Sequence, residues 1–131
     1  MIIDASALLA IALAEDDAVR MLDAISRVRV RRMPAPAWLE AAMVIDRRGN
    51  RQAIDLFAAL VQKLAIEIGA FSAEHALVAR QAWNRFGKTR HKARLNFGDC
   101  MVYAVAKVDG QALLCKGNDF IHTDIELVLK D

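Results

Sequence analysis

Three acidic residues stand in segments whose other residues favour burial. Asp4 follows an apolar tripeptide, Glu40 lies within Pro-Ala-Trp-Leu-Glu-Ala-Ala-Met-Val-Ile, and Asp99 precedes Cys-Met-Val-Tyr-Ala-Val-Ala. A lone buried carboxylate is costly and tends to take up a proton. The basic residues lie mostly in separate polar stretches, so ion pairs do not obviously satisfy these acids. A divalent cation such as Mg²⁺ or Mn²⁺ binds oxygen ligands and would satisfy them together.

A fourth acid, Asp119, lies in a polar loop near the end of the sequence, and Asp124 closes that loop. Each acid also has an ordinary structural explanation. Asp4 can cap a helix, Glu40 can lie on the polar edge of one, and Asp99 can be a first-turn acid favoured by the helix dipole. No single acid is specific, so the prediction of a metal site depends on their joint pattern.

The segments that carry these acids alternate between strands and helices. Strands are predicted at residues 1–4, 28–33, 66–68, 112–115 and 126–129. Helices are predicted at residues 7–14, 16–27, 37–48, 51–64, 73–86 and 98–108. Ser6 and Ser72 are the expected caps of the first and fifth helices, two prolines break the chain before the third, and Gly49-Asn50 ends it.

This alternation predicts an α/β fold in which helices cover both faces of a mostly parallel sheet. Ligands of such sheets bind beyond the carboxyl ends of the strands. Asp4 ends the first strand and Asp119 follows the fourth. The acids are therefore expected at the same edge of the sheet.

Composition favours one globular domain, residues 1–131. A hydrophobic fraction of 56% is enough for a packed core, and only two prolines and six glycines argue against disorder. Cys100 and Cys115 lack a CxxC partner and are expected to be small buried residues in a reducing compartment. The apolar N-terminal run has no preceding basic residue and is too short to span a bilayer. We therefore expect a cytoplasmic protein that does not associate with membranes.

The net charge of +2 conceals a basic region. Residues 80–98 contain no acid and carry six basic side chains: Arg80, Arg85, Lys88, Arg90, Lys92 and Arg94. The polar loop 88–94 directly precedes Asp99 and is predicted to contact the phosphates of a polyanion. A solvated surface loop and a catalytic base at His91 are the alternatives. Trp83 and Phe86 are more typical of core packing than of base stacking.

Four motifs together resemble a known family. Residues 1–8 resemble the opening of a PIN domain, residues 38–40 its second acidic motif, and residues 95–100 and 114–120 its third and fourth. Their order and spacing resemble VapC-type toxins of bacterial toxin–antitoxin pairs over the whole chain. Two departures are Lys116-Gly117-Asn118, where a Thr-Xaa-Asp style loop is commoner, and the added acid Asp124. Both leave open whether Asp119 or Asp124 reaches the metal.

The resemblance implies a PIN-like three-layer α/β/α sandwich and a metal-dependent endoribonuclease. Asp4 and Asp99 would be the principal ligands of Mg²⁺ or Mn²⁺, with Glu40 and Asp119 completing the catalytic acids. Three further residues would support them: Ser6, Asn118 and Asp124. The RNA-binding residues would be Lys88, Arg90, Lys92 and Arg94.

The resemblance also implies a substrate and protein partners. Transfer RNA or another structured RNA would be cut to leave 5′-phosphate and 3′-hydroxyl ends. A VapB-type antitoxin would neutralise the toxin, and two copies would form a homodimer. Part of the apolar helix surface, such as the stripe Leu56, Phe57, Leu60, Val61 and Leu64, would be core and part an interface.

Two other functions stay open at this point. A receiver-like phosphotransfer domain also places acids at strand ends, and Lys116 fits its late lysine, but Asp4 lacks the paired acid that a phosphatase version needs. A non-catalytic RNA- or partner-binding module with the same fold is the second. The presence of all four acids argues against that module.

Overall fold

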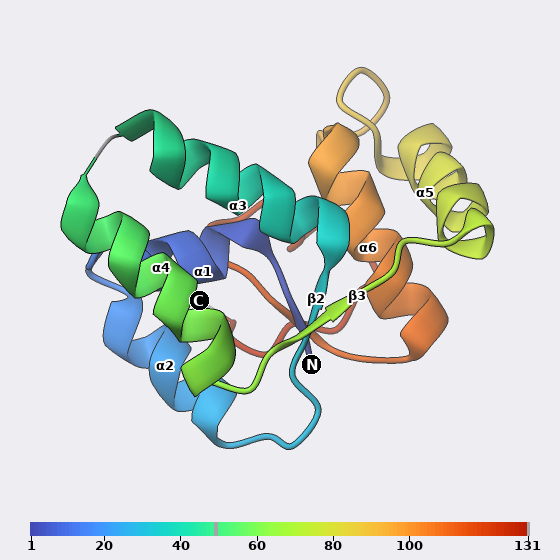
Figure 1. Ribbon diagram of the computed structural model, residues 1–131. Coiled ribbons are helices and arrows are strands. Elements are labelled where there is room, and N and C mark those ends of the chain that lie inside the picture. The colour runs from blue at the N-terminus through green and yellow to red at the C-terminus, as the bar shows by residue number, and fades with distance from the viewer. Residues whose placement is uncertain (49, 131) are drawn as a thin grey trace.

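A four-stranded parallel sheet organises the protein, and the computed structural model describes residues 1–48 and 50–130 (Figure 1). The strands are β1 (Ile2–Ile3), β2 (Arg32–Pro34), β3 (Glu67–Gly69) and β4 (Leu113–Leu114), in the order β3-β2-β1-β4. Ile2 pairs with Arg32 on one side and with Leu113 on the other. All pairings within the sheet are parallel, which confirms the predicted mostly parallel sheet.

Helices connect successive strands in pairs. They are α1 (Ala5–Ala12), α2 (Ala18–Ser26), α3 (Ala35–Arg48), α4 (Arg51–Lys63), α5 (Ala73–Phe86) and α6 (Phe97–Asp109). The chain adds strands in one direction up to β3 and then returns to place β4 beside β1. Because parallel crossovers are right-handed, this reversal puts α5 and α6 on the face opposite α1 to α4, as Figure 1 shows. The predicted three-layer α/β/α sandwich is confirmed.

The core explains the apolar N-terminal run. Ile2, Ile3 and Leu8 are fully buried. This run forms α1, which directly follows the central strand β1. The helix is apolar on most of its faces because it packs against α2, α3 and α4. Cys100 and Cys115 are buried free thiols, as expected. Among the described residues, no helix is both long and apolar enough to cross a membrane.

Two features in the first part of the chain differ from the prediction: the cap of α1 and the bounds of β2. Asp4, not Ser6, caps α1, because its carboxylate accepts the backbone N–H of Ser6. The second strand covers residues 32–34 instead of 28–33. Arg31 turns back to donate to the carbonyl oxygens of Val28 and Leu64, so the preceding residues bend instead of extending. Pro34 is the last residue of this strand.

The last predicted strand, residues 126–129, is not formed. Leu127 makes one isolated parallel bridge to Leu113, flanked by backbone hydrogen bonds from Leu113 to Glu126 and from Val128 to Leu113, both 2.9 Å. β4 is only two residues long and offers no longer ladder. Gly49 lies outside the described residues. Asn50, expected to end α3, caps α4 by accepting the Ala53 N–H.

Candidate active site

Asp4 is fixed at the carboxyl end of β1, in the middle of the sheet. Its backbone N–H donates to the Leu114 carbonyl oxygen at 2.9 Å. Its Oδ2 accepts the Ser6 N–H at 3.1 Å and the Ser6 hydroxyl at 2.5 Å. The residue is only 9% exposed. One carboxylate is thus held at the edge of the sheet by both the strand that precedes it and the helix that follows it.

Ser6 connects this carboxylate to the loop after β4. Its Oγ accepts the backbone N–H of Lys116 at 2.9 Å while donating to Asp4. The Lys116 ammonium lies 3.3 Å from a Glu15 carboxylate oxygen. Ser6 therefore lies where the sequence predicted a supporting residue, and it ties Asp4 to the segment that carries Asp119.

Asp99 lies in the first turn of α6, at the same edge of the sheet. The Asn96 side chain accepts the Asp99 N–H at 2.9 Å, and Asp99 Oδ2 accepts the Asn96 N–H at 3.1 Å. This reciprocal capping box fixes the Asp99 backbone. Asn96 was not predicted to support the site, although its spacing of three residues from Asp99 is the capping-box signal.

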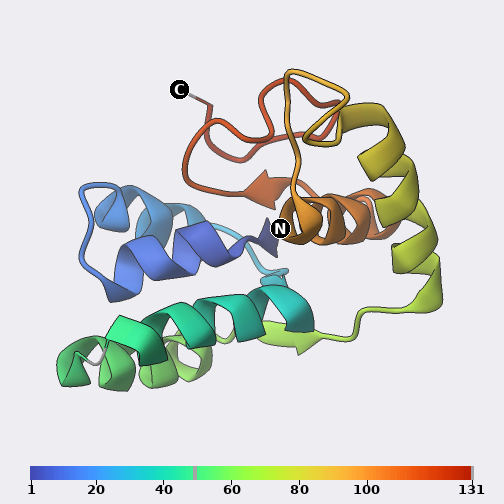
Figure 2. The same ribbon diagram turned by 90° about the horizontal axis from the view of Figure 1, so that it is seen from above.

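Glu40 reaches the site from the opposite face of the sheet. It lies in the second turn of α3, whose N-terminal end approaches α6 (Figure 2). One Glu40 carboxylate oxygen lies over the backbone of Gly98, the residue before Asp99. The contact between α3 and α6 thus brings together acids that are far apart in the sequence.

The acids interact electrostatically. Burial raises the pKa of Asp4, and repulsion from Asp119 raises it further against the opposing hydrogen bonds from Ser6. Burial also raises the pKa of Asp99 to about 6, with added repulsion from Asp119, Asp4 and Glu40. The pKa of Glu40 is raised by burial and then by Asp4. The structure therefore places each of the four predicted acids within electrostatic range of at least two of the others.

The donor set suits a hard cation. Within residues 1–48 and 50–130, no three His, Cys, Asp or Glu side chains converge tightly enough to form a ready ligand set. The mutual repulsion above nevertheless shows a concentrated negative charge made of carboxylates. Burial and three of these acids raise the pKa of the neighbouring Cys115 thiol to about 12. The four acids supply carboxylate oxygens, the donors that Mg²⁺ and Mn²⁺ prefer.

Asp124 lies apart from this group, contrary to the prediction that it supports the metal. It accepts hydrogen bonds from the Tyr103 hydroxyl at 2.5 Å, Lys107 at 2.9 Å and Arg85 at 3.3 Å. Although burial opposes the change, these partners lower its pKa to about 2. Asp124 anchors the C-terminal segment to α5 and α6, because three donors surround it there. Asn118 is exposed in the loop that carries Asp119.

The basic loop runs beside the site and is held by its own backbone. The His91 N–H donates to the Gly87 carbonyl oxygen and the Leu95 N–H to that of Phe86. The His91 Nδ1 accepts the Ala93 N–H, and its ring packs edge-on against Phe86 at 5.2 Å. These contacts give His91 a packing role and speak against a catalytic base there. Four side chains of the loop are exposed: Lys88, Arg90, Lys92 and Arg94.

Comparisons with known proteins identify the family of the chain. The PIN domain model matches residues 1–126. The chain belongs to the PIN-domain family. It is 43% identical to ribonuclease VapC30 of Mycobacterium tuberculosis, over 98% of each chain. It is also 43% identical to ribonuclease VapC of Mycolicibacterium smegmatis, over 98% of this chain and 99% of that one.

Solved structures share the PIN fold. The Mycobacterium tuberculosis toxin VapC20, described as cleaving the sarcin-ricin loop, aligns with a TM-score of 0.73 over 95% of each chain at 18% identity. A toxin–antitoxin complex from Klebsiella pneumoniae aligns with a TM-score of 0.70 over 94% of this chain and 92% of that one, at 16% identity. At these identities the likeness supports the architecture alone.

Membership of the VapC ribonucleases decides between the functions left open by the sequence. The chain is a PIN-domain endoribonuclease and the toxin member of a toxin–antitoxin pair. PIN-domain ribonucleases of this type depend on divalent metal, which agrees with a donor set made of carboxylates. The receiver-like domain and the non-catalytic module are therefore set aside.

Proposed function

We propose that Asp4 and Asp99 bind Mg²⁺ or Mn²⁺, that Glu40 and Asp119 complete the site, and that the site hydrolyses structured RNA. The observation that carries this proposal is the meeting of four acids from separate segments at one edge of the sheet. The raised pKa values of Asp4, Glu40 and Asp99 mean that ionised carboxylates are costly there without a compensating positive charge. A divalent cation supplies that charge.

The residues of the chain have distinct tasks in this reaction. Ser6 holds the Asp4 carboxylate, and Asn96 holds Asp99. A divalent cation bound at this site supplies an activated water and neutralises charge on the scissile phosphate. Attack by water leaves a 5′-phosphate and a 3′-hydroxyl. One domain, residues 1–131, is sufficient for this chemistry in our proposal.

Metal-dependent cleavage is the direct test. The purified chain, freed from any partner, is incubated with transfer RNA or a structured RNA hairpin in Mg²⁺, in Mn²⁺ and in EDTA. We expect cleavage with either metal, none in EDTA, and recovery when metal is restored in excess. End-labelling of the products checks the 5′-phosphate. Equal cleavage in EDTA would contradict the proposal.

The basic loop is proposed to hold the RNA backbone. In the described part of the chain, Lys88, Arg90, Lys92 and Arg94 have no ion-pair partner, so their charges are available to phosphates. The loop leads into the helix turn that carries Asp99. This continuity would deliver a phosphodiester to the acids despite their repulsion of a polyanion.

Neutralising the loop should weaken RNA binding and flatten its salt dependence. For Arg90, Lys92 and Arg94 all changed to Gln, we expect the slope of log K against log salt to fall by roughly 2 to 3, at ~0.7 to 0.9 per lost phosphate contact. A matched control changes Arg47, Arg48 and Arg51 to Gln, which removes the same charge where α3 ends and α4 begins. Equal slopes in both variants, measured by fluorescence anisotropy, would show that the loop is ordinary surface.

Two partners follow from the family. We propose that a VapB-type antitoxin blocks the site in the cytoplasm, in support of which the chain resembles proteins named VapC. We also propose a homodimer. The predicted stripe on α4 does not supply its surface, because Phe57 and Leu60 are buried and only Leu56 is substantially exposed.

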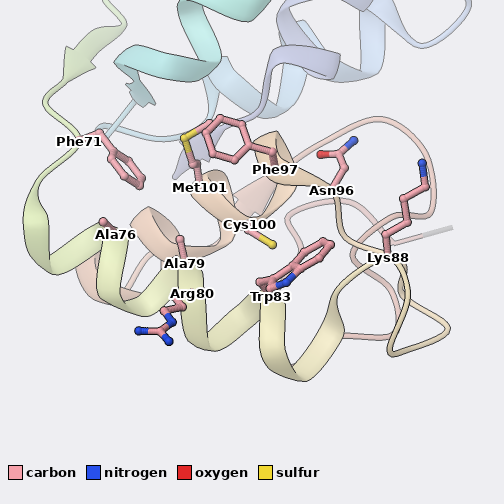
Figure 3. Close-up of a pocket in the computed structure, with 10 residues that line it drawn as sticks. All are labelled: Phe71, Ala76, Ala79, Arg80, Trp83, Lys88, Asn96, Phe97, Cys100 and Met101. Carbon is pink, nitrogen blue, oxygen red and sulfur yellow. The ribbon is translucent and has the colours of Figure 1, made fainter.

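An apolar surface on α3 and α6 is the better candidate for the dimer. Leu39, Met43 and Phe97 are 53%, 62% and 79% exposed. Two grooves of about 710 and 660 Å³ meet there, both lined by Phe97 and Met101. Figure 3 shows these two side chains from α6 and Trp83 from α5 around the larger groove. Large exposed apolar patches are typical of protein interfaces, and a second copy would cover this one.

Light scattering checks this pairing. The chain should have twice its monomer mass, and Met43→Glu should shift it towards the monomer. Val19→Glu is the control, because Val19 is 76% exposed on α2, away from the patch. A monomeric wild type would contradict the homodimer.

A further inference from the structure

Gly98 lies in the first turn of α6, directly before Asp99. Its backbone is not left-handed; positive φ values among the described glycines occur at Gly110 and Gly117. The backbone conformation therefore does not require glycine here. Alanine has the higher helix propensity, so glycine carries a cost at this position. The reason for glycine must be sought in what approaches it.

A carboxylate occupies the space where a side chain would be. A Cβ built on Gly98 would lie 2.6 Å from Glu40 Oε2 and 3.5 Å from Glu40 Cδ, with Asn96 Oδ1 at 3.6 Å. The first distance is shorter than real Cβ contacts allow. The obstructing atom is the end of a flexible side chain on another helix. An added methyl group would therefore displace the Glu40 carboxylate and leave the backbone in place.

The other described glycines do not share this feature. A Cβ on Gly69 would meet Arg32 Cγ at 3.6 Å, an ordinary contact, and a Cβ on Gly110 or Gly117 would meet nothing within 4 Å. Gly87 packs against Trp83. Gly98 is thus distinguished by its contact with one of the four acids.

We infer that Gly98 is a positioning residue: by lacking a side chain, it lets the Glu40 carboxylate of α3 lie against the first turn of α6, beside Asp99. This inference rests on the proposed role of Glu40 in the metal site. Glycine lowers the stability of α6 relative to alanine. In return, it leaves the space that the Glu40 carboxylate of α3 occupies.

The test combines Gly98→Ala, Glu40→Ala and the double variant, with Gly69→Ala as the control. Calorimetry measures Mn²⁺ affinity, and thermal unfolding without metal measures stability. We expect Gly98→Ala to weaken Mn²⁺ binding by about 10-fold without lowering the melting temperature. In the Glu40→Ala background, the same change should cause no further loss, because the carboxylate that the methyl group displaces is gone. Gly69→Ala should leave Mn²⁺ affinity unchanged.

Two outcomes would overturn the inference: unchanged Mn²⁺ affinity in Gly98→Ala although Glu40→Ala weakens binding, or an equal loss with and without the Glu40 side chain. A crystal structure of Gly98→Ala separates this inference from the proposed function. If the Glu40 carboxylate moves but Glu40→Ala still binds Mn²⁺ normally, the metal role of Glu40 is wrong and the positioning by Gly98 stands. If the carboxylate stays in place, the positioning inference fails.

Discussion

Asp99→Asn should abolish RNA cleavage while stabilising the metal-free protein at neutral pH. Asparagine preserves the size of the side chain and can still accept the Asn96 N–H, so the capping box survives. The loss of an anionic metal ligand removes several kcal/mol of transition-state stabilisation. At about 1.4 kcal/mol per tenfold, we expect a rate lower by about three orders of magnitude.

The stabilisation follows from the raised pKa of Asp99. That pKa is about 6 in the folded protein, against ~3.9 in an unfolded chain. Between these values the unfolded chain loses its proton first, so the free energy of unfolding falls as the pH rises and stays lower above pH 6. Asp99→Asn removes this contribution, and we expect a gain of about 1–2 kcal/mol at pH 7 after allowance for solvent screening.

Denaturant unfolding from pH 4 to pH 8 with EDTA present measures this effect. The wild type should lose more stability over that range than Asp99→Asn, whose curve keeps the contributions of Asp4 and Glu40. Asp55→Asn is the control, because Asp55 is an exposed acid on α4. Retained cleavage, or parallel stability curves for the wild type and Asp99→Asn, would rule out this role for Asp99.

Asp4 should give a different pattern because its carboxylate has two functions. It caps α1 through the Ser6 N–H and is also a proposed ligand. Asp4→Asn keeps a good cap and removes the buried charge, whereas Asp4→Ala also removes the cap. Both variants should lose cleavage by about three orders of magnitude.

Their stabilities should differ. We expect Asp4→Ala to be less stable than Asp4→Asn by about 1 kcal/mol, the usual cost of a lost cap. Cleavage assays and urea unfolding at pH 7 in EDTA measure the two effects on the same samples. The two-function assignment fails if the variants are equally stable, or if Asp4→Asn still cuts RNA.

The sequence predicts the acids and the sheet because burial and periodicity are local signals. Asp4 and Asp99 stand out by the apolar residues beside them, and strands alternating with helices imply a parallel sheet. The Asp119 prediction depended on the family resemblance. Its placement near Asp4 comes from the pairing of β1 with β4, which brings the loop after β4 to the edge where Asp4 lies.

Other features were hidden because they depend on contacts between distant segments. Asp124 is surrounded by donors from α5 and α6, and nothing in its own neighbourhood shows this. The role of Gly98 depends on its contact with Glu40, which lies on α3, far earlier in the sequence. The last strand was overpredicted because alternation does not reveal that β4 is too short to pair with it.

The pairing of β1 with β4 also has a consequence for biosynthesis. Asp4 directly follows β1, the first of the four strands in chain order, and β1 pairs with β4, the last of the four. A growing chain that has not yet released β4 cannot complete the centre of its sheet or bring Asp119 to Asp4. The four acids can therefore meet only after the segment that follows β4 has been synthesised.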